Sequence, residues 1–78
     1  MLVTVVRFSG RKLRRLRKAR GWSGEDVARA ACIDRERYFD MEEHSREPGF
    51  REGMGLARVL GVPAVDLTTR RRVRVAGD

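Results

Sequence analysis

The chain has 78 residues and a net charge of +7, from 18 basic and 11 acidic side chains. This length allows one small domain with a thin stability margin. One cysteine excludes an intramolecular disulfide, and one histidine excludes a zinc site built from cysteines and histidines. No apolar run reaches about 18 residues, so we expect no membrane span and a cytoplasmic protein.

The basic side chains are concentrated at the two ends of the chain. Residues 1–22 carry eight basic residues and no acid, and residues 70–78 carry four arginines and one acid. The middle, residues 23–69, has ten acids and six arginines. The excess of positive charge favours a polyanionic partner, most simply nucleic acid. The alternative is a solvated helix face followed by a disordered basic tail.

The first part of the chain predicts a strand followed by a helix. Residues 2–8 are rich in β-branched side chains, which favour a short strand. Ser9 is expected to cap a helix that runs to about Arg20, and Gly21 to end it in the left-handed conformation. We therefore divide the chain into a strand-like arm (1–8), a helical domain (9–68) and a basic tail or strand (69–78).

The central stretch, residues 23–42, predicts two short helices joined by a tight turn. Ser23 and Asp26 have the spacing of a capping box, and Asp34 can cap a second helix. We expect helices over residues 24–31 and 35–43. The alanine-rich run between the caps allows the two helices to cross closely, as in a helix-turn-helix.

The remainder predicts a further helix, a last short helix and a strand. Pro48-Gly49 marks a turn, and the apolar spacing predicts a helix over residues 50–60 that ends at Gly61. Pro63 suits the start of a short helix over residues 64–68. Arginine and valine then alternate over residues 71–75, as in a half-exposed strand.

These elements together resemble the helix-turn-helix domain of the Cro and phage-repressor type. The resemblance covers residues 8–67 and implies a compact all-α bundle of about five short helices. The short β-strands predicted at the two ends come from the residues themselves, and the strand before the first helix departs from the family pattern. The resemblance also implies sequence-specific binding to double-stranded DNA as a dimer, in a transcriptional repressor or other regulator of a bacterium or phage, with no cofactor and no metal. It is carried by Leu13, Arg17, Gly21, Ser23, Val27, Ala28, Ile33, Glu42, Pro48, Ala57, Leu60, Gly61 and Val62.

The second helix of such a motif enters the major groove with its first residues against base edges. Arg35 has the chemistry to bind guanine O6 and N7, and Glu36 to accept from cytosine N4. Arg37 and Asp40 complete the predicted base-reading set. The predicted phosphate contacts are Lys12, Ser23, Arg46 and Arg51. The resemblance further implies that Arg17 and Glu42 form an internal salt bridge, which removes both from the DNA-contacting set.

The sequence departs from the family pattern at several of these positions. Residues 35–43 hold four acids against two arginines, and acids are repelled by phosphates. Gly24 and Cys32 stand where the family often has glutamine and glycine. The alternative function is therefore a protein-interaction module whose acidic helix binds a basic protein partner. No arrangement of serine, histidine and acid supports an enzyme.

The two strand-like ends predict an assembly. An unpaired strand exposes a row of backbone groups, so residues 3–8 and 72–75 are expected to pair with each other. Such a pair alone is marginal, and two chains would bury its edge across a two-fold axis. We therefore predict a homodimer with at least one terminal strand in its interface, the alternative being that both ends are disordered.

Overall fold

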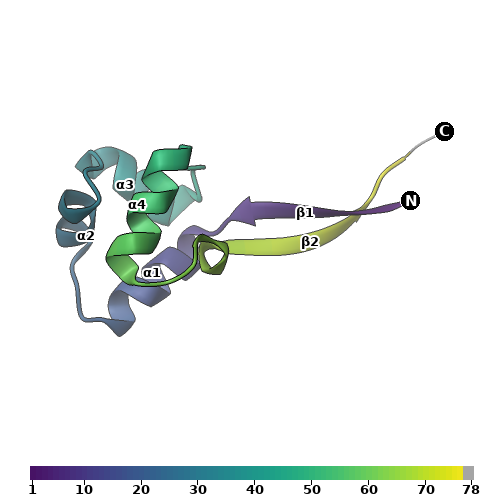
Figure 1. Ribbon diagram of the computed structural model, residues 1–78. Helices are drawn as coiled ribbons and strands as arrows, with labels where there is room; N and C mark the ends of the chain where they lie inside the picture. Colours follow the sequence, from purple (N-terminus) through teal and green to yellow (C-terminus); the bar gives the residue numbers. More distant parts are fainter. Residues whose placement is uncertain (77–78) are drawn as a thin grey trace.

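The computed structural model describes residues 1–76, which form a helical body with a two-stranded ribbon that projects from it (Figure 1). The described part measures 48 × 21 × 20 Å along its principal axes, and the ribbon accounts for the long dimension. The elements in order are β1 (Leu2–Phe8), α1 (Gly10–Ala19), α2 (Gly24–Ala30), α3 (Arg35–His44), α4 (Phe50–Leu60), a 3-10 helix η1 (Ala64–Leu67) and β2 (Thr68–Arg74).

Side-chain caps set the start of the first three helices. Ser9, Ser23 and Asp34 each accept a hydrogen bond from a backbone amide two or three residues later. Each bond satisfies an amide that has no partner within its own helix. The predicted caps are therefore confirmed, and so is the left-handed conformation of Gly21, at φ +70°. Gly61, predicted to end α4, is also left-handed, at φ +69°.

The core lies where α1, α2, α3 and α4 meet. Each large apolar side chain that is buried there contributes about 1.5–3 kcal/mol, before the entropy cost of folding. The largest fully buried side chains are Tyr38, Leu13, Met41, Leu56, Leu60 and Val27.

No helix within residues 1–76 is both long and apolar enough to cross a bilayer.

The ribbon joins the two ends of the described chain in one antiparallel pair. Its register runs from Phe8 opposite Thr68 at the base to Leu2 opposite Arg74. At the far end the Val75 amide donates to the Met1 carbonyl, with 2.9 Å between nitrogen and oxygen. The ends of the described chain therefore lie side by side, far from the helices (Figure 1).

Two hydrogen bonds hold the base of the ribbon to the body, and a third lies next to them at the start of α1. The Phe8 amide donates to Glu47 Oε1 at 3.0 Å, and Lys12 Nζ donates to the Thr68 carbonyl at 2.7 Å. The Gly10 amide, just beyond β1, donates to Ser45 Oγ at 3.0 Å. Because Phe8 itself is buried, the ribbon leaves the body at a fixed position beside the loop that follows α3.

Several predicted boundaries and the all-α class need correction. Residues 1–76 contain four α-helices rather than about five, because the last predicted helix is a four-residue 3-10 turn, Ala64–Leu67. The predicted pairing of the two strand-like ends is confirmed, so the fold is mostly helical with a β-ribbon and not all-α; residues 77–78 of the predicted tail lie outside the described residues. β2 begins at Thr68, three residues before the predicted start, because its first residues pair with residues 6–8. That pairing is not visible in the local sequence.

Candidate nucleic-acid interface

The turn between α2 and α3 sets the angle of the helix-turn-helix. The Ile33 amide donates to the Ala28 carbonyl at 2.8 Å, and the buried Ile33 side chain anchors the turn in the core. Between them, Cys32 is exposed and lies at φ +58°, in the left-handed region where glycine is favoured. The turn thus has the conformation that a family glycine would adopt, with a side chain added.

Gly24, at the start of α2, is explained by Phe39 of α3. A Cβ on Gly24 would lie 2.7 Å from Phe39 Cε1, closer than real contacts allow. The Phe39 ring stands edge-on to Tyr38, with 5.5 Å between ring centroids. A glutamine at position 24 is therefore excluded while Phe39 keeps this place, and the first residue of α2 offers only its backbone.

The four predicted base-reading residues differ in how freely they face solvent. Arg35 is 70% exposed at the first turn of α3, with its guanidinium carbon 5.8 Å from the centre of the Phe39 ring. Its Nε also lies 3.1 Å from Glu25 Oε2. Glu36 is exposed beside it. These residues form the outer surface at the N-terminal end of α3.

Arg37 and Asp40 are both engaged with neighbouring elements. Arg37 Nη2 donates to Glu52 Oε1 of α4 at 2.7 Å. That bond, together with one from the Gly49 amide, lowers the Glu52 pKa to about 2. Asp40 Oδ2 lies 3.2 Å from Arg46 Nη1. Base contact by Arg37 would thus require it to leave a charge-assisted hydrogen bond.

The four predicted phosphate contacts also separate into engaged and free side chains. Lys12 donates to the Thr68 carbonyl and Ser23 accepts from the Asp26 amide, so both have structural roles in this conformation. Arg46 is also engaged, in its ion pair with Asp40. Arg51 on α4 is exposed and has no ion-pair partner within residues 1–76. No three histidine, cysteine or acidic side chains in the described part of the chain are placed to hold a metal ion.

The helix-turn-helix family model matches residues 13–67, which include α2, the turn and α3. The chain belongs to the helix-turn-helix family of the Cro and phage-repressor type. Among solved structures it is similar to the restriction-modification controller protein C.AhdI from Aeromonas hydrophila, with 31% identity and a TM-score of 0.69. That match covers 74% of this chain and 88% of the controller protein. No curated protein matches the sequence. Family membership identifies the chain as a DNA-binding transcriptional regulator.

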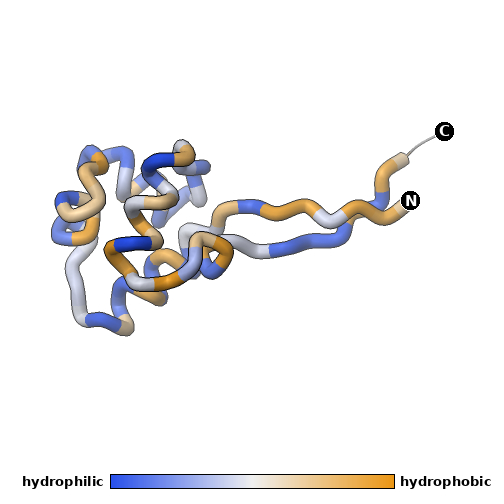
Figure 2. Tube along the Cα trace, in the orientation of Figure 1, coloured by the Kyte–Doolittle hydropathy of each residue, from blue (hydrophilic) through white to orange (hydrophobic). Residues whose placement is uncertain are grey.

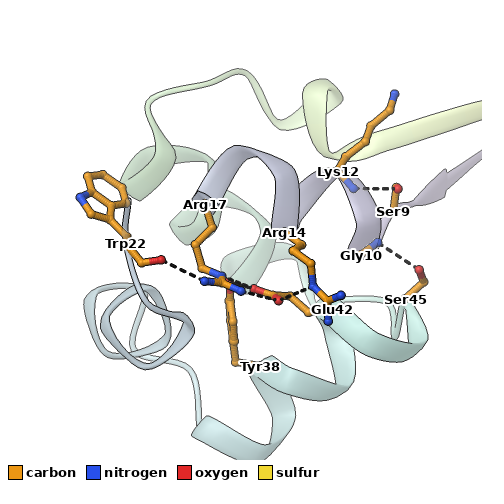
Figure 3. A network of polar contacts seen from close by, with 9 residues as sticks. All are labelled: Ser9, Gly10, Lys12, Arg14, Arg17, Trp22, Tyr38, Glu42 and Ser45. Atoms are coloured by element: carbon orange, nitrogen blue, oxygen red, sulfur yellow. Dashed lines mark hydrogen bonds and ion pairs between the residues drawn. The ribbon is translucent and has the colours of Figure 1, made fainter. Parts of the chain in front are cut away.

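In this helix-turn-helix regulator, Arg17 and Glu42 form the centre of a buried polar network (Figure 3). Arg17 Nε lies 2.6 Å from Glu42 Oε2, and its Nη2 donates to Glu42 Oε1 at 3.0 Å. Arg14 Nε adds a contact at 3.3 Å, and the Tyr38 hydroxyl donates to the same carboxylate. Arg17 Nη1 also donates to the Trp22 carbonyl at 2.9 Å. The network therefore joins α1 to α3 and to the loop before α2.

The pKa values in this network follow from burial and hydrogen bonding. Burial alone would raise the Glu42 pKa, but the bonds from Arg17, Tyr38 and Arg14 outweigh it and leave that pKa below its ordinary value. Burial, followed by the bond to Glu42, raises the pKa of Tyr38. At neutral pH the regulator therefore holds an ionised carboxylate whose side chain is only 1% exposed.

No signal in the sequence indicates which acids form ion pairs with the arginines of α3. Glu25 and Glu52 come from α2 and α4, and no local pattern relates them to Arg35 and Arg37. The contact of Arg35 with Phe39 could have been predicted from the sequence, because side chains four residues apart on a helix are neighbours. The surface around the N-terminal half of α3 thus depends on residues from three helices.

Proposed function

We propose that this regulator acts in the cytoplasm by binding an operator as a homodimer, with the N-terminal end of α3 in the major groove. The observation that carries the proposal is Arg35, which is exposed at the first turn of α3 and lies against the Phe39 ring. A guanidinium held in this way is suited to bidentate contact with guanine. Glu36 beside it is suited to cytosine N4.

Substitution of Arg35 tests this readout. Arg35→Ala should weaken operator binding by about 1–3 kcal/mol and relax the preference at one base pair. Arg46→Ala should instead weaken all sequences about equally. Binding is measured by fluorescence anisotropy, first on the DNA upstream of the gene and beside any restriction-modification genes, because the chain is similar to a controller of such a system.

Arg58→Ala on the far part of α4 is the matched control for these measurements. Arg58 is exposed and has no ion pair within residues 1–76, so its loss should leave specificity unchanged. The readout proposal is wrong if Arg35→Ala and Arg37→Ala both leave operator affinity at the wild-type value.

The homodimer would form through an apolar surface on α4 and β1. Phe50 is 83% exposed there, and Met54 and Val6 are exposed on the same side. They border a hollow of about 300 Å³ that Gly53 leaves open. A two-fold axis through this surface would place Phe50 of each chain in the hollow of the other, with β1 in the interface. Such a pair matches the symmetry of a palindromic operator.

Sedimentation equilibrium tests the dimer. Phe50→Ser should convert the protein to a monomer that binds half-sites poorly, without loss of helix content, because Phe50 is not part of the core. Val65→Ser on η1 is the control, since Val65 is also an exposed apolar residue but lies away from the hollow's rim. Equal dimerisation of wild type and Phe50→Ser would place the interface elsewhere.

The acidic character of α3 supports a second candidate function, binding of a basic protein partner. Asp40→Asn and Glu43→Gln should tighten DNA binding if α3 lies beside phosphates, because they remove repulsion. The same changes should weaken a protein complex. Purification from the native host with and without nuclease distinguishes the two. A stoichiometric protein that survives nuclease, with no DNA bound, would favour the second function.

A further inference from the structure

The ribbon carries a concentration of arginines that the fold does not use. Within the ribbon, residues 1–8 and 68–76, there are five arginines and no acid. All five are exposed, and none lies within ion-pair distance of a carboxylate of residues 1–76. Figure 2 shows that β1 is mostly hydrophobic and most of β2 hydrophilic. The five residues are Arg7, Arg70, Arg71, Arg72 and Arg74.

Three of these side chains form a row on one face of β2. Alternate residues of a strand point to the same face, so Arg70, Arg72 and Arg74 share one side of the ribbon. At about 3.4 Å per residue the row is about 14 Å long and the whole ribbon about 20 Å. A regular, projecting row of free guanidinium groups is complementary to a polyanion with regularly spaced charges.

The helix-turn-helix itself is poor in free positive charge. Arg35 and Arg37 of α3 both have acidic neighbours, Glu25 and Glu52. Most of the affinity of proteins for DNA comes from contacts with phosphates. A regulator with an acidic α3 therefore needs its phosphate contacts from another part of the molecule.

The attachment of the ribbon places it beside the C-terminal end of α3. Ser45 and Glu47, just after α3, accept hydrogen bonds from the amides of Gly10 and Phe8. Body and ribbon together extend 48 Å, more than the pitch of one turn of B-DNA, about 34 Å. The molecule is therefore long enough for the ribbon to contact duplex that flanks a groove occupied by α3, and the major groove admits a two-stranded ribbon.

We propose that β2 is a second DNA-binding element, in which Arg70, Arg72 and Arg74 contact phosphates of the duplex beside the site bound by α3. This rests on the proposed function for the position of α3, but the phosphate contact itself does not depend on sequence. Arg70 pairs with Val6, so the row lies on the same face of the ribbon as Val6, and Arg72 and Arg74 extend along that face beyond the proposed dimer surface. A competing role for the same arginines is to keep the free edge of β2 from pairing with other strands.

The test uses a duplex of about 40 base pairs of random sequence, close to four helical turns. The variant replaces the row (Arg70→Gln, Arg72→Gln, Arg74→Gln). The matched control removes three exposed charges of the body (Arg15→Gln, Lys18→Gln, Arg58→Gln). Each phosphate contact steepens the slope of log affinity against log salt by about 0.9. Raising the salt from about 50 to 200 mM lowers the affinity of the wild type by some factor. The loss of three contacts should make that factor roughly forty-fold smaller, whereas the control variant should keep most of it.

A charge-retaining variant and an assembly measurement make the result decisive. The same three residues changed to lysine should keep the wild-type salt dependence, and sedimentation should show the wild-type association state for every variant. The proposal is overturned if the glutamine variant and the control behave alike, if the glutamine variant aggregates or dissociates and loses affinity for that reason, or if single-stranded RNA of equal length binds the row more tightly than the duplex.

The outcome is separable from that of the proposed function. Arg35→Ala should lower affinity for a selected operator and leave random-duplex binding unchanged, whereas the ribbon variant should lower both. If only the ribbon variant has an effect, operator readout by α3 fails and the ribbon proposal stands. If only Arg35→Ala has an effect, the reverse holds, and if the wild type binds no duplex, both fail.

Discussion

Replacing Glu42 with glutamine would remove the charge at the centre of the network that joins α1 to α3. The substitution keeps the size of the side chain, so it creates no cavity. It leaves Arg17, whose side chain is only 13% exposed, facing a neutral amide instead of a carboxylate at 2.6 Å. It also leaves the Tyr38 hydroxyl with a weaker acceptor.

The expected loss is large relative to the total stability. Removing one partner of a buried ion pair costs about 3–5 kcal/mol, because the other charge stays buried without compensation. A domain of this size has about 4–12 kcal/mol in total. In thermal denaturation followed by circular dichroism, such a loss should lower Tm by at least about 12 °C.

The pH dependence of the loss follows from the lowered pKa of Glu42. A carboxyl whose pKa is lower in the folded state stabilises the fold above its ordinary pKa of 4.5. That contribution is lost as the pH falls through the folded-state value. The difference in Tm between wild type and Glu42→Gln should therefore be greatest near neutral pH and shrink below about pH 4.5.

Glu43→Gln is the control, because Glu43 is the next residue in α3 and is exposed. It should change the free energy of unfolding by less than about 0.5 kcal/mol. The reasoning would be refuted if Glu42→Gln cost less than about 1 kcal/mol, or if its cost stayed constant down to acid pH.

Three further predictions concern local features. Gly10→Ala should destabilise by more than about 2 kcal/mol in urea denaturation, because its Cβ would lie 2.2 Å from a backbone carbonyl oxygen of α3. Gly53→Ala should instead stabilise the fold by about 0.5–1 kcal/mol, because the nearest atom to its added Cβ is 3.8 Å away. A change of stability with the same sign for Gly10→Ala and Gly53→Ala would contradict the argument. Cys32→Gly should raise stability by about 0.5–1 kcal/mol, since its φ of +58° is strained for any side chain, and no gain in Tm would show that the turn relaxes. Because the Arg37 bond lowers the Glu52 pKa to about 2, wild type should lose stability between pH 4.5 and 2. The Glu52→Gln variant should lose less stability over that pH range. If the urea midpoints of wild type and variant fall in parallel with pH, the ion pair does not contribute to stability.

The helices could be predicted because their signals are local. Ser9, Ser23 and Asp34 cap helices within three residues of themselves, and Gly21 and Gly61 end helices at their own positions. Capping bonds and left-handed glycines depend on neighbours in sequence, so the pattern alone contains the information.

The remaining features depend on residues that are distant in sequence. The start of β2 at Thr68 is set by its partner Phe8, and Lys12 is directed toward the Thr68 carbonyl by that same packing. The reason for Gly24 lies in the position of Phe39, on another helix. Contacts of this kind follow from tertiary packing, which overrides local propensity.

The ribbon also fixes the order in which the molecule can be completed. Leu2 pairs with Arg74 and Phe8 with Thr68, so β1 must wait for its partner until residues 68–74 have left the ribosome. Pairings this far apart in sequence form late in folding. During that interval the apolar strand β1 is without its partner, while the helices can already pack. A chain cut short before residue 68 would keep β1 unpaired, with a free edge open to aggregation and proteolysis.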